Sequence, residues 1–242
     1  MDLNLDRLNF GEIHLWYLQV DTLDYCLNLF TGLLTQDEKI ANDRFSNAEA
    51  KKTHLIARGA SRILLSRYSG LAPTELCFQK NQYGRPHLDP IPDPPLHFNI
   101  THTSGMVVLA FARTPEIGVD IEALDANVDA MALAEANFSL AEYNDLKKIP
   151  EADQKLRFFH YWTLKEAYIK ARGMGLSLPL EKFSFQLDSM KSIQFFCDKS
   201  IMEQPEAWQF RLFSPTPKYQ LAVALRYPSL AVREYIFKPI LE

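Results

Sequence analysis

Two acidic residues in one short segment are the first candidates for chemistry. The segment Ile117-Gly118-Val119-Asp120-Ile121-Glu122 alternates apolar and acidic residues. As a strand, it would point both carboxylates to one face and Val119 and Ile121 to the other. Two like charges on one face repel each other. The pair therefore fits either a solvated sheet edge or a site where a divalent cation lies between the carboxylates.

A second segment combines an acid, a base and an aromatic ring. Trp162, Glu166 and Lys170 are four residues apart, so in a helix they lie along one stripe. A surface pair of Glu166 and Lys170 would stabilise the helix by about 0.2–0.5 kcal/mol. Trp162 favours packed surroundings instead, where a carboxylate needs a partner. The spacing alone leaves both interpretations open.

Hydroxyl, imidazole and guanidinium groups gather in a third region. Arg85 lies in a glycine-containing turn, and Thr101 and His102 end the segment Phe98-Asn99-Ile100-Thr101-His102. Such donors at a turn can hold phosphate oxygens, and an arginine can bind phosphate through two hydrogen bonds. A lone histidine at a strand end more often has a structural role, so this region also has two interpretations.

Two long amphipathic helices would position these groups. Apolar residues recur with helical spacing from about residue 47 to 68 and from about 151 to 171, and each run ends near a glycine, Gly70 or Gly173. Similar strands follow each helix. This repetition, about 105 to 113 residues apart, predicts a duplicated α+β unit.

The composition is that of a soluble globular protein. Of the 242 residues, 47% are hydrophobic and 23% are charged, and the formal net charge is −4, which argues against a nucleic-acid platform. The longest apolar run, Met106–Ala112, is far shorter than the roughly 20 residues of a membrane-spanning helix. The N-terminus lacks the basic and apolar regions of a signal peptide, and the three cysteines lie far apart. These features predict a cytoplasmic protein with free thiols.

Four motifs follow one another along the chain. They are Tyr83-Gly84-Arg85-Pro86, Phe98-Asn99-Ile100-Thr101-His102, Gly118-Val119-Asp120-Ile121-Glu122 and Trp162-Thr163-Leu164-Lys165-Glu166-Ala167-Tyr168-Ile169-Lys170. In this order and spacing they resemble the 4′-phosphopantetheinyl transferases of the surfactin-synthetase-activating (Sfp) type. The resemblance implies an enzyme that transfers the 4′-phosphopantetheine arm of coenzyme A to a serine of an acyl or peptidyl carrier protein, in fatty-acid, polyketide or nonribosomal-peptide biosynthesis. Adenosine 3′,5′-bisphosphate would be released.

The resemblance also implies roles for individual residues. Asp120, Glu122 and Glu166 would bind Mg²⁺, with Mn²⁺ as a substitute. Asp120, Glu166 and Lys170 would be the catalytic residues, with Glu166 as the base for the serine and Lys170 beside the pyrophosphate. Coenzyme A would contact Lys170 and five further residues, which are Arg44, Arg58, Arg85, Thr101 and His102. Ala41 stands where the family frequently has a basic residue, so one contact to the adenosine 3′-phosphate is in doubt.

The fold implied by the resemblance is an α+β pseudo-dimer of two similar halves, each an antiparallel sheet with a long helix. The active site would lie in the cleft between them. Residues 1–115 would form the half with the coenzyme A contacts, and residues 116–242 the half with the metal-binding acids. A monomer is expected, because the two halves are joined covalently.

Two other functions would use the same residues. A Mg²⁺-dependent phosphodiesterase would need the three acids, but an acidic net charge does not suit a nucleic-acid substrate. A catalytically silent coenzyme A or carrier-protein binder would be expected to lack one of the acids, and all three are present.

Overall fold

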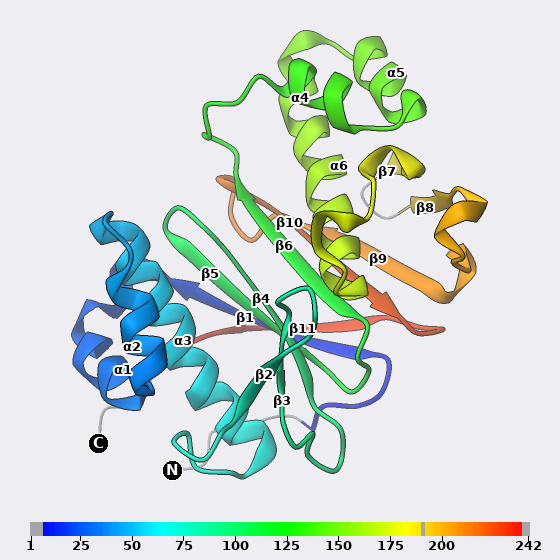
Figure 1. Ribbon diagram of the computed structural model, residues 1–242. Helices are drawn as coiled ribbons and strands as arrows, with labels where there is room; N and C mark the ends of the chain where they lie inside the picture. Colours follow the sequence, from blue (N-terminus) through cyan, green and yellow to red (C-terminus); the bar gives the residue numbers. More distant parts are fainter. Residues whose placement is uncertain (1–6, 190–191, 239–242) are drawn as a thin grey trace. The chain divides into compact units, whose positions relative to one another are not determined.

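Two helices of 22 residues each dominate the secondary structure, one in each of two units (Figure 1). The computed structural model describes residues 7–189 and 192–238. Within this part of the chain, the first unit consists of residues 7–80, 86–115 and 231–238, and the second of residues 81–85 and 116–230.

The predicted halves are residues 1–115 and 116–242. Two segments of the structure belong to the other unit than this division predicts. The strand β11 (Ala231–Ile236) pairs with β1 (Glu12–Gln19), so it completes the first sheet. The turn at residues 81–85 belongs to the second unit, where the side chain of Asn81 donates to the carbonyl of Gly173. In both cases, hydrogen bonds to a segment distant in sequence connect the segment to its unit.

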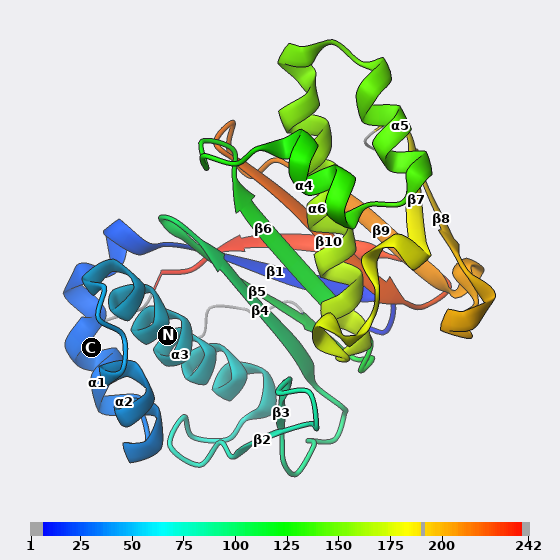
Figure 2. The same cartoon turned by 45° about the horizontal axis from the view of Figure 1, so that its top comes forward.

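The first unit is a four-stranded sheet covered by a long helix (Figure 2). The strand order is β11, β1, β5, β4. The pairing of β1 with β11 is parallel and the other pairings are antiparallel, so the sheet is mixed instead of fully antiparallel as expected. The elements other than β1 and β11 are η1 (Val20–Cys26), α1 (Leu27–Leu33), α2 (Gln36–Asp43), α3 (Ala48–Ser69), β2 (Phe78–Lys80), β3 (Pro86–Leu88), β4 (His97–Thr103) and β5 (Met106–Ala112). Apolar side chains of α3 pack on β1, β4 and β5 to form the core.

The second unit repeats this plan with a three-stranded antiparallel sheet in the order β6, β10, β9. Its elements are β6 (Ile117–Ala123), α4 (Ala130–Asn137), α5 (Leu140–Lys148), α6 (Glu151–Arg172), η2 (Gly175–Ser177), η3 (Leu180–Lys182), β7 (Phe183–Ser189), β8 (Ser192–Cys197), η4 (Lys199–Ile201), η5 (Pro205–Ala207), β9 (Trp208–Phe213) and β10 (Tyr219–Arg226). The long helix α6 packs on β6 and β10 (Figure 1). The prediction of an α+β protein with two similar halves is confirmed.

The long helices α3 and α6 end where the sequence favours termination. Asn47 caps the start of α3 by accepting a hydrogen bond from the backbone of Ala50 at 2.9 Å. Gly70 and Gly173 follow the two helices with φ angles of 76° and 62°, a left-handed conformation that glycine adopts without strain. Neither these nor any other helix in the described residues is both long and apolar enough to cross a membrane.

A buried ion pair holds α6 against α5 on the face of α6 that points into the core of the second unit. The Lys165 ammonium lies 2.8 Å from the Glu142 carboxylate of α5 and donates to the carbonyls of Leu180 and Phe183. Glu142 also forms a capping box with Ser139 at the start of α5. Each charge is thus satisfied, which a buried ion pair requires.

The backbones of β6 and α6 meet at Gly118. A Cβ atom built at Gly118 would overlap the carbonyl of Ala167 and the backbone nitrogen of Ala171. A glycine inside a strand commonly marks such a close approach of another backbone. Gly118 shares one face of β6 with Asp120 and Glu122, so this contact brings α6 over the two acids.

Replacing Gly118 with Ala is expected to destabilise the protein. The added methyl group would force α6 away from β6, and overpacking of this kind typically costs about 1–3 kcal/mol. Equilibrium unfolding in urea measures the change in the free energy of unfolding. In the control Gly32→Ala in α1, the new Cβ meets no atom within 4 Å, and the helix should gain up to about 1 kcal/mol. Wild-type stability of Gly118→Ala would disprove the need for this contact.

Candidate active site

The acids of β6 are set in a partly buried position. Val119 and Ile121 are buried on one face of the strand, and Asp120 and Glu122 lie on the other. Asp120 is only 4% exposed, so solvation at a sheet edge does not explain the acidic pair. A buried carboxylate needs a partner, and the partners come from α6.

Two residues of the α6 stripe hold one acid each. The Lys170 ammonium donates to Oδ1 of Asp120 at 2.6 Å. The Trp162 indole nitrogen donates to Oε1 of Glu122 at 3.2 Å. The stripe predicted from the spacing of four therefore faces β6, and Lys170 pairs with the strand.

These two contacts determine how α6 lies along β6. Trp162 and Lys170 are about 12 Å apart along the helix axis, and Asp120 and Glu122 are about 7 Å apart along the strand. Since Trp162 meets Glu122 and Lys170 meets Asp120, the helix runs antiparallel to the strand. Glu166 lies midway between the two contacts on the same stripe, so it faces the acidic pair.

Burial and the repulsion of neighbouring carboxylates weaken Glu122 and Glu166 as acids. Burial, followed by the charge of Asp120, raises the pKa of Glu122 to about 7, although Trp162 and Lys170 act in the opposite direction. Burial and the charge of Asp120 also raise the pKa of Glu166. The three carboxylates thus interact electrostatically, and a bound cation would relieve their repulsion.

The donor set suits a hard divalent cation. Asp120, Glu122 and Glu166 offer carboxylate oxygens, which Mg²⁺ and Mn²⁺ prefer. Residues 7–189 and 192–238 contain no group of three or more His, Cys, Asp or Glu side chains that are already positioned to hold a metal ion. The chemistry and charge of the cluster fit the ion, while Lys170 and Trp162 each hold an oxygen of the acids on β6.

Arg85, which is expected to contact phosphate, forms hydrogen bonds to two backbone carbonyls. Its guanidinium donates to the carbonyl of Ala171 at 2.6 Å and to that of Ile117 at 2.9 Å. Burial lowers the pKa of Arg85 to about 10. These bonds connect the end of α6 to the start of β6, so Arg85 helps to hold the helix on the strand. No local pattern predicts this role, because the accepting carbonyls belong to distant segments.

The other predicted coenzyme A contacts lie in the first unit. Arg58 is on α3, Arg44 follows α2, and Thr101 and His102 are neighbours on β4, Thr101 buried and His102 exposed. After burial, the positive charges of Arg58 and His102 are the main causes that lower the pKa of His54. These three basic side chains therefore lie close enough to one another to interact electrostatically. His54 is not among the predicted contacts, although it precedes Arg58 by four residues on one helix.

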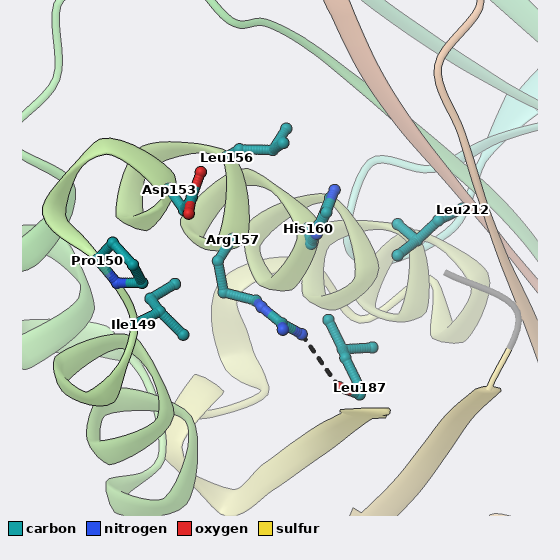
Figure 3. Close-up of a pocket in the computed structure, with 8 residues that line it drawn as sticks. All are labelled: Ile149, Pro150, Asp153, Leu156, Arg157, His160, Leu187 and Leu212. Atoms are coloured by element: carbon teal, nitrogen blue, oxygen red, sulfur yellow. Dashed lines mark hydrogen bonds between the residues drawn. The ribbon is translucent and has the colours of Figure 1, made fainter. Parts of the chain in front are cut away.

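A pocket of about 350 Å³ in the second unit contains none of the predicted site residues (Figure 3). It is lined by Ile149, Pro150, Asp153, Leu156, Arg157, His160, Leu187 and Leu212. Arg157 donates to the carbonyl of Leu187 across it. Burial lowers the pKa of His160 to about 4, so this imidazole is neutral at pH 7.

Similarity to known proteins covers most of the chain. A family model described as 4′-phosphopantetheinyl transferase superfamily matches residues 116–224, and one described as 4′-phosphopantetheinyl transferase, N-terminal, matches residues 23–114. The 4′-phosphopantetheinyl transferase HetI of Nostoc sp. is 30% identical over 223 residues, which are 92% of this chain and 90% of HetI. The 4′-phosphopantetheinyl transferase Sfp of Bacillus subtilis is 31% identical over 201 residues, which are 82% of this chain and 85% of Sfp. These matches confirm the resemblance carried by the four motifs, and the chain belongs to the 4′-phosphopantetheinyl transferase family.

Proposed function

We propose that this protein transfers 4′-phosphopantetheine from coenzyme A to a serine of an acyl or peptidyl carrier protein. The observation that carries the proposal is the α6 stripe, on which Lys170 pairs with Asp120 and Glu166 interacts electrostatically with Asp120 and Glu122. The names of HetI and Sfp support the same activity. From sequence features alone, we also propose that the protein is a monomer in the cytoplasm.

We assign a Mg²⁺ ion to Asp120, Glu122 and Glu166. Mg²⁺ is usually held by a few carboxylates together with substrate phosphates. The mutual repulsion of these three carboxylates favours a cation among them. When bound, the ion neutralises negative charge on the pyrophosphate.

The proposed reaction exchanges one oxygen–phosphorus bond for another. The serine oxygen attacks the β-phosphorus of coenzyme A, and the bond from that phosphorus to the bridging oxygen breaks, releasing adenosine 3′,5′-bisphosphate. The Glu166 carboxylate accepts the serine proton, and its raised pKa makes it a stronger base than an ordinary glutamate. Lys170 stabilises the leaving phosphate, since an ammonium group has three N–H donors and can keep its bond to Asp120.

We assign coenzyme A binding to Arg44, Arg58, Thr101 and His102, together with Lys170. The electrostatic interaction of Arg58 and His102 with the same residue, His54, supports the two as neighbouring contacts for a phosphate group. Arg85 stays in the predicted set, but its bonds to two backbone carbonyls favour a structural role.

Incubation with coenzyme A, Mg²⁺ and a panel of unmodified fatty-acid, polyketide and peptide carriers should add one phosphopantetheine group to a carrier serine, read by intact mass. EDTA should abolish the transfer, and Mg²⁺ or Mn²⁺ should restore it.

Glu166→Gln should lower kcat/KM at least about 100-fold, because a charge-stabilising group and base is lost.

The matched control for that variant is Glu151→Gln, which removes an exposed carboxylate at the start of the same helix and should leave the rate unchanged. Hydrolysis of coenzyme A without carrier modification would favour the phosphodiesterase alternative. Coenzyme A that binds but stays intact would favour the silent binder.

The stability of the metal-free protein should fall as the pH rises through about 7. The pKa of Glu122 is raised in the folded state to about 7, above its usual value near 4.5, so the folded protein binds this proton more tightly than the unfolded chain. This contribution to stability is complete below pH 4.5 and is lost as Glu122 ionises. Glu122→Gln should therefore show a smaller decrease in melting temperature between pH 5 and pH 8 in EDTA. Identical pH dependence of the two proteins would contradict the cause assigned to this shift.

Alanine at Arg58 or His102 should weaken coenzyme A binding more than it slows the saturated reaction. Loss of a charge-assisted hydrogen bond to phosphate should raise the KM for coenzyme A roughly 10-fold or more. If either residue holds the 3′-phosphate, its defect disappears with dephospho-coenzyme A. Lys51→Ala on the same helix as Arg58 is the control. An unchanged KM in both variants would remove them from the binding site.

A further inference from the structure

We propose that Trp162 is a positioning residue: its indole N–H holds the Glu122 carboxylate in the orientation that a bound metal ion requires. This inference rests on the proposed function, because it concerns one of the three acids assigned to Mg²⁺. It adds a residue to that site which contacts a ligand of the ion instead of the ion itself.

The first support is the environment of the Glu122 side chain. Gln220 lies opposite Glu122 on β10, but its amide nitrogen donates to the carbonyls of Phe213 and Leu221. The Gln220 amide N–H groups thus bond to backbone carbonyls of the sheet. Trp162 reaches Glu122 from α6 and donates to Oε1 at 3.2 Å.

The second support is that the Trp162 ring is itself held in place. It stacks on Phe158 with ring centres 5.7 Å apart and an interplanar angle of 27°, and Phe138 lies 6.4 Å away. A tryptophan has only two side-chain torsions, and packing on two rings limits both. The N–H group is therefore a fixed donor, unlike one at the end of a flexible chain.

The third support is the charge of the donor. Lys170 neutralises Asp120 but repels an incoming cation, whereas the indole of Trp162 is neutral and does not. A neutral donor to one carboxylate oxygen leaves the other oxygen for the ion. Hydrogen bonds of this kind to metal ligands orient them, and their loss typically weakens metal binding 10–100-fold.

Packing alone does not account for the contact. Trp208, a buried tryptophan of the same unit, packs on Tyr168 and Phe210, and within the described residues its indole nitrogen has no hydrogen-bond partner. This unit can therefore bury an indole without directing its N–H at a carboxylate. Trp208 also provides a matched control, because Trp208→Phe removes the same atoms without removing such a bond.

The test titrates wild type, Trp162→Phe and Trp208→Phe with Mn²⁺ alone and follows the free ion by electron paramagnetic resonance. Trp162→Phe should raise the Kd for Mn²⁺ by about 10–100-fold, and Trp208→Phe should bind as wild type does. In transfer assays, the Mg²⁺ concentration that gives half the maximal rate should rise by a similar factor in Trp162→Phe. The kcat at saturating Mg²⁺ should change much less, which separates positioning from general damage to the fold.

Unchanged Mn²⁺ affinity in Trp162→Phe, or equal losses in both variants, would overturn the inference and leave the proposed function intact. Absence of Mn²⁺ binding by wild type would instead overturn the metal assignment.

A spectrum of the wild-type protein keeps the inference testable if Trp162→Phe does not fold. The protein contains three tryptophans, and Trp16→Phe and Trp208→Phe assign the other two indole N–H resonances in a proton–nitrogen correlation spectrum. Added Mg²⁺ should shift the Trp162 resonance and leave that of Trp208 in place. A Trp162 resonance that stays in place while the metal binds would overturn the inference.

Discussion

The backbone contact between β6 and α6 at Gly118 is the constraint on which the candidate site depends. With no side chain at this position, the helix lies directly on the strand. Asp120 and Glu122 follow on the same face of β6, so Lys170 and Trp162 reach them with direct hydrogen bonds. Arg85 reinforces the contact at the point where α6 ends and β6 begins. A helix held farther away would leave Asp120 as a buried charge without its ion pair.

The same closeness gives the site its electrostatic character. Three carboxylates are partly removed from water, which raises the pKa values of Glu122 and Glu166. Lys170 offsets one of the charges, and the remaining repulsion is a structural reason for the cluster to attract a cation. The core side of α6 is arranged differently, since Lys165 and Glu142 neutralise each other and both also form hydrogen bonds to backbone groups. One helix thus has a closed charge pair on one side and an incompletely neutralised cluster on the other.

Periodicity in the sequence predicted the features that depend on local geometry. The alternation around Asp120 and the spacing of Trp162, Glu166 and Lys170 predicted which side chains share a face, and the glycines after the long helices predicted their ends. Local periodicity did not predict the features that depend on pairing between distant segments. Arg85 binds carbonyls of Ala171 and Ile117, and a carbonyl has no sequence signature.

A few missed features did leave a signal. Gly118 lies two residues before Asp120, so its place on the acidic face was readable, but its need for the helix backbone was not. His54 shares a helix face with Arg58, and its spacing would have predicted a basic cluster. The parallel strand β11 carries charged residues and little apolar alternation, which hides its place in the first sheet.

The pairing of β1 with β11 has a consequence for how the chain folds during its synthesis on the ribosome. β1 spans residues 12–19 and β11 spans residues 231–236, so the ribosome must synthesise every residue between them before this edge of the first sheet is covered. Every strand of the β6–β10–β9 sheet is translated before β11. Until β11 is made, the β1 edge of the nascent first unit is unpaired on that side. Unpaired strand edges readily pair with other chains. The order of translation therefore leaves the β1 edge of the first sheet to be covered after all strands of the β6–β10–β9 sheet have been made.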